Sequence, residues 1–178
     1  ASLTGLPNNQ IDFDVPIAGI LHTSCPHHYR FAQPGEGEED FATRLAADLE
    51  SLILREGPDT VAAFIAEPVM GAGGVIVPPV TYFEKITQVC RTYDLYMISD
   101  EVICGFGRLG AAFGCEALGF KAHSISVAKA LTSAYVPVAA LTVPEVMYQA
   151  LIDESRRIGT FGHGFTYSGH PVAAAVAL

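Results

Sequence analysis

Apolar residues recur along the chain with two different periods. Between Asp40 and Gly57 they fall at helical spacing, at Phe41, Leu45, Leu49, Leu52 and Ile53. Residues 61–66 then form a short continuous apolar run, which is typical of a buried strand in a parallel sheet. The helical period returns over residues 81–93. The first half of the chain is therefore expected to form a helix, a buried strand and a second helix.

The second half continues this alternation. Residues 95–99 and 124–128 are apolar runs that predict two more buried strands, with a glycine-rich loop and a short helix between them. Residues 136–143 predict a fourth strand, and residues 144–157 predict an amphipathic helix. This order is typical of crossover units around a parallel sheet. We therefore predict an α/β fold, with a mostly parallel sheet flanked by helices.

Two of the predicted helices begin at recognisable signals. Thr81 and Glu84 have the spacing of a capping box, in which each side chain accepts a hydrogen bond from a backbone N–H. Residues 165–170 precede Pro171 and an alanine-rich helix, and proline suits the first helical turn. Hydroxyl groups and free backbone N–H groups at such a start can hold an anion. An ordinary capped helix is the commoner arrangement, so an anion site here gains weight only beside other evidence for a phosphorylated ligand.

Composition and charge exclude several classes of function. Half of the residues are hydrophobic, 16% are charged and the formal net charge is -9, with no cluster of basic residues. Such a chain is not expected to bind nucleic acid. The longest apolar run is too short to span a membrane and contains Pro137. Four cysteines without a CxxC pair are typical of reduced thiols in a cytoplasmic protein.

The two ends of the chain suggest an internal piece of a longer protein. The first residue is not methionine, and no leader peptide is visible. Residues 171–178 form a helical apolar run that lacks a glycine or basic C-cap. We therefore expect further chain on both sides.

Lys129 is the first residue that points to a particular chemistry. It is one of three lysines in the chain and directly follows the apolar run 124–128. Burial disfavours the charged form of an amine, and a neutral, confined amine can form a Schiff base with an aldehyde. The position of Lys129 therefore predicts carbonyl chemistry at a desolvated lysine.

Asp100 is expected to face the same ligand as Lys129. Each is the first charged residue after a predicted strand, and parallel strands open on one edge of a sheet, where α/β folds bind ligands. A carboxylate beside the ring nitrogen of a pyridine cofactor keeps that nitrogen protonated and makes the ring an electron sink. Asp100 and Glu101 point to opposite sides in an alternating strand, so only one can act, and we assign Asp100. Together Asp100 and Lys129 predict a pyridoxal phosphate site.

The sequence fits three other kinds of site less well. Residues 105–110 match the G-x-G-x-x-G pattern of dinucleotide sites, but two carboxylates precede them and no acidic residue lies about 20 positions beyond. No G-x-S-x-G motif supports a serine nucleophile. Metal-capable atoms at residues 22–28 show no repeated ligand spacing, so no metal site is predicted. The dinucleotide, serine and metal sites are rejected.

Four stretches together carry a family resemblance. They are Ala66-Glu-Pro-Val-Met-Gly-Ala-Gly-Gly-Val-Ile-Val-Pro-Pro, Ser99-Asp-Glu-Val-Ile-Cys-Gly-Phe-Gly-Arg, Ser126-Val-Ala-Lys-Ala-Leu and His163-Gly-Phe-Thr-Tyr-Ser-Gly-His-Pro. In this order and spacing the chain, from about residue 62 to its end, resembles the class III (fold type I) aminotransferases. Within that class it is most similar to the ω-amino acid and amine–pyruvate transaminases.

The resemblance implies a role for each matching residue. Lys129 would be the Schiff-base lysine of pyridoxal phosphate and then the proton shuttle. Asp100 would pair with the pyridinium nitrogen, and Val102 would pack on one face of the ring. Thr166 would contact the cofactor phosphate of a neighbouring subunit, which implies a homodimer with a shared active site. Glu67 resembles the glutamate that pairs with a mobile arginine that binds the substrate carboxylate.

The resemblance also implies an activity. A primary amine or ω-amino acid would donate its amino group to an oxo acid such as pyruvate; the alternatives are an aminomutase or decarboxylase reaction on the same scaffold, or an inactive truncated subunit. Residues 1–178 would be part of the large cofactor-binding domain, with the phosphate cup upstream and the small domain downstream. The 178 residues alone are therefore expected to show little turnover. Ala122-His123 and Leu109 depart from the residues usual in relatives, at positions that bear no chemistry.

Overall fold

The computed structural model describes residues 1–178 and divides the chain into two compact units. The first unit consists of Ala1–Val61 and Met70–Val89, and the second of Ala62–Val69 and Cys90–Leu178. No helix in the structure is both long enough and apolar enough to cross a bilayer.

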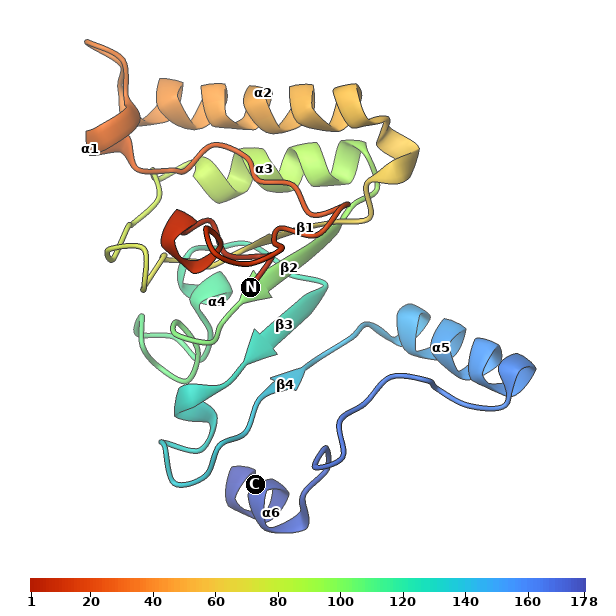
Figure 1. Ribbon diagram of the computed structural model, residues 1–178. Helices are drawn as coiled ribbons and strands as arrows, with labels where there is room; N and C mark the ends of the chain where they lie inside the picture. Colours follow the sequence, from red (N-terminus) through yellow and green to blue (C-terminus); the bar gives the residue numbers. More distant parts are fainter. The chain divides into compact units, whose positions relative to one another are not determined.

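Two long helices dominate the first unit. Its elements are the 3₁₀ turn η1 (Pro7–Asn9), α1 (His28–Phe31), α2 (Glu38–Glu56), the 3₁₀ turn η2 (Pro58–Thr60) and most of α3 (Tyr82–Thr92). Helices α2 and α3 lie side by side, and the Lys85 ammonium of α3 is 3.6 Å from the Glu39 carboxylate of α2 (Figure 1). Both predicted helices of the first half are confirmed.

Helix α2 forms because its apolar residues share one face. Four of the five residues predicted for that face are buried, and Leu52 alone stays half-buried. The helix begins two residues before Asp40, with three acidic residues in its first turn, where the helix dipole favours negative charge. It ends at Gly57, whose φ of 93° favours glycine over a residue with a Cβ.

The start of α3 differs from the sequence prediction. The Thr81 hydroxyl is buried without a hydrogen-bond partner, so the predicted capping box with Glu84 is wrong. A backbone turn leads into the helix instead, in which the Tyr82 N–H donates to the Pro79 carbonyl at 3.0 Å. The spacing of the two residues was correct, but the hydroxyl does not reach the backbone N–H that a capping box requires.

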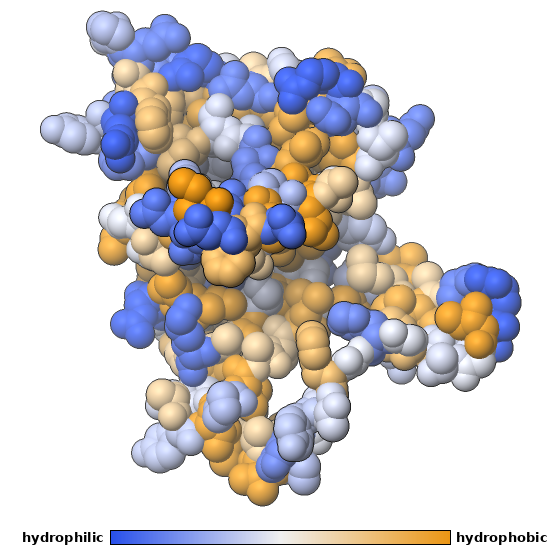
Figure 2. Space-filling model, in the orientation of Figure 1, coloured by the Kyte–Doolittle hydropathy of each residue, from blue (hydrophilic) through white to orange (hydrophobic).

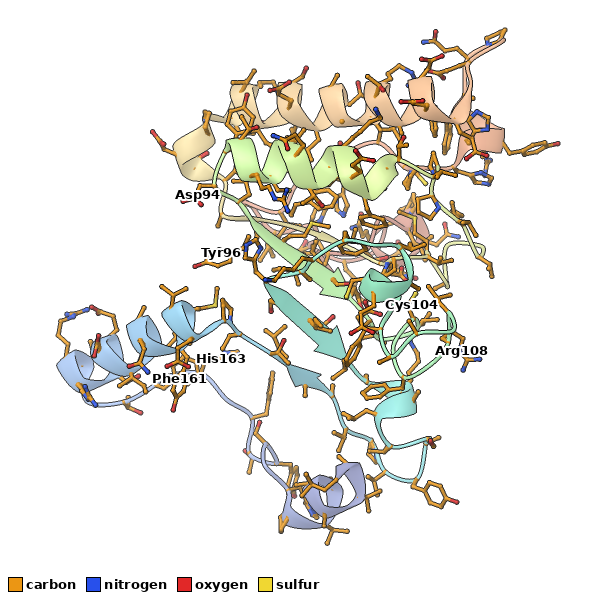
Figure 3. All side chains as sticks on the ribbon, turned by 180° about the vertical axis from the view of Figure 1, so that it is seen from behind. Asp94, Tyr96, Cys104, Arg108, Phe161 and His163 are labelled. Carbon is orange, nitrogen blue, oxygen red and sulfur yellow. The ribbon has the colours of Figure 1, made fainter.

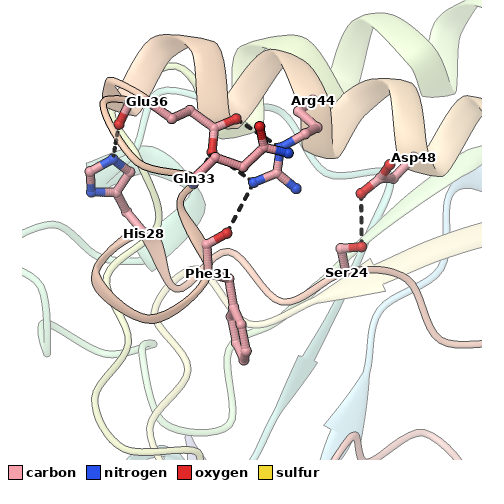
Figure 4. A network of polar contacts seen from close by, with 7 residues as sticks. All are labelled: Ser24, His28, Phe31, Gln33, Glu36, Arg44 and Asp48. Atoms are coloured by element: carbon pink, nitrogen blue, oxygen red, sulfur yellow. Dashed lines mark hydrogen bonds and ion pairs between the residues drawn. The ribbon is translucent and has the colours of Figure 1, made fainter.

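A polar network joins the segment before α2 to the helix itself (Figure 4). Arg44 donates from Nε and Nη2 to the two carboxylate oxygens of Glu36, both at 2.7 Å. The Gln33 N–H also donates to this carboxylate, at 2.8 Å, and Arg44 donates to the Phe31 carbonyl. The hydrogen bonds from Arg44 are the main reason that the pKa of Glu36 falls to about 2. His28 contacts the Glu36 carbonyl oxygen at 2.9 Å, so this histidine has a structural role.

Replacing Glu36 with glutamine is expected to remove a pH-dependent part of the stability. The folded-state pKa of Glu36 lies below its ordinary value of 4.5, so its contribution is present above pH 4.5 and is lost as pH falls towards about 2. The melting temperatures of the wild type and the E36Q variant should therefore differ near neutral pH and converge in acid. Asp12→Asn, at an exposed loop carboxylate, is the matched control. A difference between wild type and E36Q that stayed constant from pH 7 to pH 2 would contradict the assignment.

The second unit is built on a four-stranded sheet with strand order β1-β2-β3-β4 (Figure 1). Its strands are β1 (Ala63–Ala66), β2 (Tyr96–Asp100), β3 (Ser124–Val127) and β4 (Ala140–Leu141). The first three are parallel and β4 pairs antiparallel with β3. The predicted α/β fold with a mostly parallel sheet is confirmed.

The fourth strand is much shorter than predicted. Residues 136–143 were expected to be strand, but only Ala140–Leu141 pair with β3. Pro137 has no N–H to donate to a ladder, which prevents the first part of this run from pairing. The connection from Val127 to Ala140 contains one 3₁₀ turn in place of a crossover helix, so the chain returns antiparallel.

Burial along the strands is less complete than their apolar sequences predicted. Strand β2 buries Met97 and Ser99 while its other residues are half-buried. In β1 only Phe64 is buried and Ala63 is exposed. Strand β1 lies at the edge of the sheet, where one side of the strand has no neighbour, and this accounts for the exposure.

The remaining helices of this unit are α4 (Gly114–Ala117), the 3₁₀ turn η3 (Lys129–Leu131), α5 (Glu145–Ile158) and α6 (Pro171–Ala177). The predicted helices near residues 144–157 and after Pro171 are confirmed. Neither α5 nor α6 has a buried residue. Figure 2 accordingly shows apolar side chains at the surface of the segment that carries α5, where Val146 is 66% exposed.

Candidate active site

The ends of three parallel strands bring the predicted site residues to one edge of the sheet. Ala66 pairs with Ser99, so Glu67 follows the end of β1 beside Asp100, the last residue of β2. Asp100 in turn pairs with Ser126 of β3, and Lys129 follows that strand by two residues. Parallel strands end on the same side, so Glu67, Asp100 and Lys129 share the carboxyl edge that the sequence predicted for them.

The Asp100 carboxylate is held by two donors on the protein. The Ser126 hydroxyl and the Val102 N–H each donate to Oδ1 at 3.1 Å. Both hydrogen bonds end on Oδ1, which leaves Oδ2 available to a ligand. Asp100 and Val102 are half-buried. The arrangement suits a carboxylate that presents one oxygen to a cationic N–H group of a ligand.

The neighbouring carboxylate of Glu101 has a different environment. It is fully buried and accepts three hydrogen bonds: from the Ser99 hydroxyl at 2.8 Å, the Gly114 N–H at 2.7 Å and the Cys115 N–H at 2.8 Å. All three donors belong to the protein, so Glu101 joins the end of β2 to the start of α4. The sequence separated Asp100 from Glu101 by strand alternation but did not identify this structural role.

Close packing at Gly114 accompanies the approach of the first backbone N–H groups of α4 to the Glu101 carboxylate. A Cβ atom at Gly114 would lie 2.8 Å from the Cβ atoms of Cys104 and Pro68, so the position requires glycine. Cys104 lies beside α4 (Figure 3), and its thiol donates to the Val69 carbonyl at 3.2 Å. Burial raises the pKa of the Cys104 thiol and raises that of Cys115 to about 11. Both thiols are therefore protonated at neutral pH and serve packing.

Lys129 differs from its prediction in one respect. The sequence predicted a desolvated amine, but Lys129 is exposed in the structure. The residue lies beyond the last paired position of β3, in the turn η3, where no neighbouring strand covers it. Its φ is 46°, in the left-handed region that non-glycine residues rarely adopt. Such backbone strain clusters at functional sites and is consistent with a residue whose direction matters.

Thr166 belongs to a different segment from the strand-end residues. It lies exposed between α5 and α6. Nearby, the Phe165 N–H donates to the Ser168 hydroxyl at 3.2 Å. The rings of Phe161 and His163, both labelled in Figure 3, have centroids 6.2 Å apart. The segment thus presents hydroxyl and aromatic side chains to its surroundings.

His123 has a structural role that its sequence position did not reveal. Its ring Nδ1 accepts a hydrogen bond from the Met97 N–H at 2.9 Å, and the backbone N–H of His123 donates to the Met97 carbonyl at 2.8 Å. Its ring also meets Tyr96 edge to face, with centroids 5.4 Å apart (Figure 3 labels Tyr96). His123 therefore ties the start of β3 to β2. Only the parallel pairing of the two strands reveals this, because the partners are 26 residues apart.

Comparison with known protein families gives one match over most of the chain. The family described as Aminotransferase class-III matches residues 14–178. The match covers every residue placed at the strand ends and the segment that carries Thr166.

Curated relatives and solved structures agree with this match. The chain is 60% identical to gamma aminobutyrate transaminase 3, chloroplastic, of Solanum lycopersicum, covering all of this chain and 34% of that protein. It is 58% identical to vanillin aminotransferase of Capsicum chinense, covering 39% of it. A crystal structure of the omega transaminase from Pseudomonas jessenii in complex with PMP is 58% identical, with a TM-score of 0.96 over 99% of this chain and 39% of that one. The chain thus spans little more than a third of the length of these relatives.

Proposed function

Because the chain belongs to the class-III aminotransferase family, we propose that it forms part of the large cofactor-binding domain of a pyridoxal-phosphate-dependent aminotransferase. The enzyme would transfer an amino group from a primary amine or ω-amino acid to an oxo acid such as pyruvate. The observation that carries the proposal is the shared edge of β2 and β3, at which a hydrogen-bonded carboxylate and a lysine follow adjacent parallel strands.

The residues at this edge fit pyridoxal phosphate. A protonated ring nitrogen needs an anionic partner, and Asp100 offers Oδ2 while two donors hold Oδ1. Val102, two residues on, supplies an apolar side chain for one face of the ring. Lys129 supplies a primary amine for the aldehyde. When bound, the cofactor supplies a ring that stabilises negative charge developing on the substrate carbon.

Asp100 and Lys129 divide the chemistry between them. Asp100 would hold a proton on the ring nitrogen of a bound cofactor by placing a carboxylate beside it. Lys129 would bind the cofactor aldehyde, and its amine would serve the proton of the substrate carbon as a general base and then as a general acid. The exposure of Lys129 supports this second role, because an amine beyond the strand end is free to move between two positions.

Glu67 is the residue on the substrate side. We propose that it pairs with a mobile arginine outside these 178 residues when the substrate carries no carboxylate. Its place after β1, in line with Asp100, supports this role. Several relatives are named gamma aminobutyrate transaminases, which makes γ-aminobutyrate the first donor to test.

The proposed enzyme is a homodimer that shares its active sites. Thr166 would contact the cofactor phosphate of the neighbouring subunit. The exposure of Thr166 supports this role, because its hydroxyl is open to a neighbouring subunit.

The cysteines support a reducing compartment such as the cytoplasm. All four are free in the structure. The names of the tomato and rice relatives include chloroplastic and mitochondrial, and the free thiols fit the interior of those compartments equally.

The decisive experiment follows amino-group transfer in the full-length protein. Purified protein with pyridoxal phosphate is incubated with γ-aminobutyrate and pyruvate, and alanine is measured. Formation of alanine in step with loss of the donor is expected, and the cofactor should exchange between its two forms when one substrate is supplied alone. Binding of the cofactor without exchange of the amino group, over a panel of amine donors, would overturn the proposed reaction in favour of another one on this scaffold.

A further inference from the structure

We propose that Ser126 is a positioning residue that sets the orientation of the Asp100 carboxylate. The inference rests on the proposed function, because Asp100 acts through the ring nitrogen of the cofactor. Ser126 lies on β3, three residues before Lys129 and opposite Asp100 in the sheet register. One strand thus carries both the residue that holds the carboxylate and the lysine.

The hydroxyl of Ser126 and its backbone make two separate contacts with β2. The hydroxyl donates to Oδ1 of Asp100 at 3.1 Å. The backbone carbonyl of Ser126 accepts the Glu101 N–H at 2.9 Å. Because the backbone contact does not depend on the side chain, removal of the hydroxyl leaves the strand pairing in place. The effect of the hydroxyl on Asp100 can therefore be tested by itself.

The hydroxyl acts on Asp100 through the orientation of the carboxylate. With the Val102 N–H it binds Oδ1, which restricts rotation of the carboxylate and leaves Oδ2 for the ligand. A carboxylate held in this way would present Oδ2 to the ring nitrogen of the cofactor and stabilise the proton there. Without the hydroxyl, the carboxylate would turn more freely and stabilise that proton less.

Two serines of β3 provide a matched pair for the test. The Ser124 hydroxyl donates to the Thr142 carbonyl of the segment after β4 and makes no contact with Asp100. Ser124→Ala therefore removes the same group from the same strand without touching the carboxylate. Ser126→Thr keeps a hydroxyl at the critical position, and its β-branched side chain suits a strand.

The experiment uses the full-length holoenzyme and its S126A, S126T, S126C and S124A variants. The first measurement is the dissociation constant of pyridoxal phosphate, by absorbance titration. The second is the ¹⁵N resonance of a ring-labelled cofactor over a range of pH, which reports the protonation of the ring nitrogen directly. Looser positioning of Asp100 should weaken its contact with the ring nitrogen and so weaken cofactor binding about tenfold in S126A. The ring-nitrogen resonance of S126A should move towards that of an unprotonated pyridine.

Each outcome bears on the proposal. Restoration by S126T, with S124A like the wild type, supports the role of the hydroxyl. If S126A binds the cofactor and protonates it as the wild type does, the inference is wrong while the proposed function stands. If S126A and S126T lost cofactor affinity equally, the shape of the side chain and not its hydroxyl would matter. That result would also overturn the inference. S126C, which is nearly isosteric and a weak donor, replaces S126A should that variant fail to fold. A wild type that binds no pyridoxal phosphate would overturn the proposed function itself.

Discussion

Lys129→Ala is expected to lower the turnover of the full-length enzyme by about 10²–10⁴-fold, the usual contribution of a positioned general acid–base group. The variant would lose the amine to which the proposed mechanism assigns the proton transfer, while Asp100 and its hydrogen bonds to Ser126 and Val102 remain. Alanine formation from pyruvate measures the loss. Borohydride reduction of the wild type followed by peptide mass spectrometry should find the cofactor on the peptide that contains Lys129.

The other lysines supply the control for this experiment. Lys121 is exposed shortly before β3, and Lys121→Ala should retain wild-type turnover. Lys85 lies in the first unit, 3.6 Å from Glu39. Attachment of the cofactor to Lys85 or Lys121, or full turnover in the K129A variant, would disprove the assignment of Lys129. The S126A variant tests Asp100 independently of Lys129, because it disturbs the carboxylate and leaves the lysine in place.

Glu101→Ala is expected to lower the free energy of unfolding by about 3–5 kcal/mol, because the substitution leaves buried donors without an acceptor and opens a cavity. Glu101 accepts hydrogen bonds from the Ser99 hydroxyl and from the N–H groups of Gly114 and Cys115, all of which are buried. Urea titration followed by circular dichroism of the full-length protein measures the change.

Two variants calibrate the effect at Glu101. Glu101→Gln keeps one acceptor oxygen but points an amide group at a donor, so its loss of stability should be intermediate. Glu116→Ala removes an exposed carboxylate from the same helix, α4, and should cost less than about 1 kcal/mol. If E101A were no less stable than E116A, the structural role of Glu101 would be wrong. The distinction between a structural Glu101 and a ligand-binding Asp100 would then lose its support.

Elements whose formation depends on local pattern could be predicted. Helix α2 followed from the spacing of Phe41, Leu45, Leu49 and Ile53, and all four are buried. The first three strands followed from continuous apolar runs. The predictions that failed depend on distant neighbours. The residues around Pro137 do not pair, because a strand needs a partner with the right register as well as an apolar sequence. The Thr81 hydroxyl has the right spacing for a cap but not the right geometry.

A carboxylate and a lysine, the residue types that suit pyridoxal phosphate, stand at the ends of apolar runs in the sequence. Asp100 and Lys129 each follow such a run, and parallel pairing brings the two strand ends to one edge. Their order along the chain, with the surrounding motifs, was enough to indicate the family. The resemblance of the four motifs indicated the family, and residue type and spacing by themselves predicted only the kind of site.

Only the tertiary structure distinguished the roles of neighbouring residues. Strand alternation separates Asp100 from Glu101, but the buried donors of α4 show which carboxylate is structural. The serine that holds Asp100 lies 26 residues away, as does the partner of His123. Hydrogen bonds depend on distances of a few tenths of an ångström and on direction, and these are set when strands pair. The sequence by itself determined which chemical groups meet at the edge of the sheet, and folding decided which atoms of those groups remain available to a ligand.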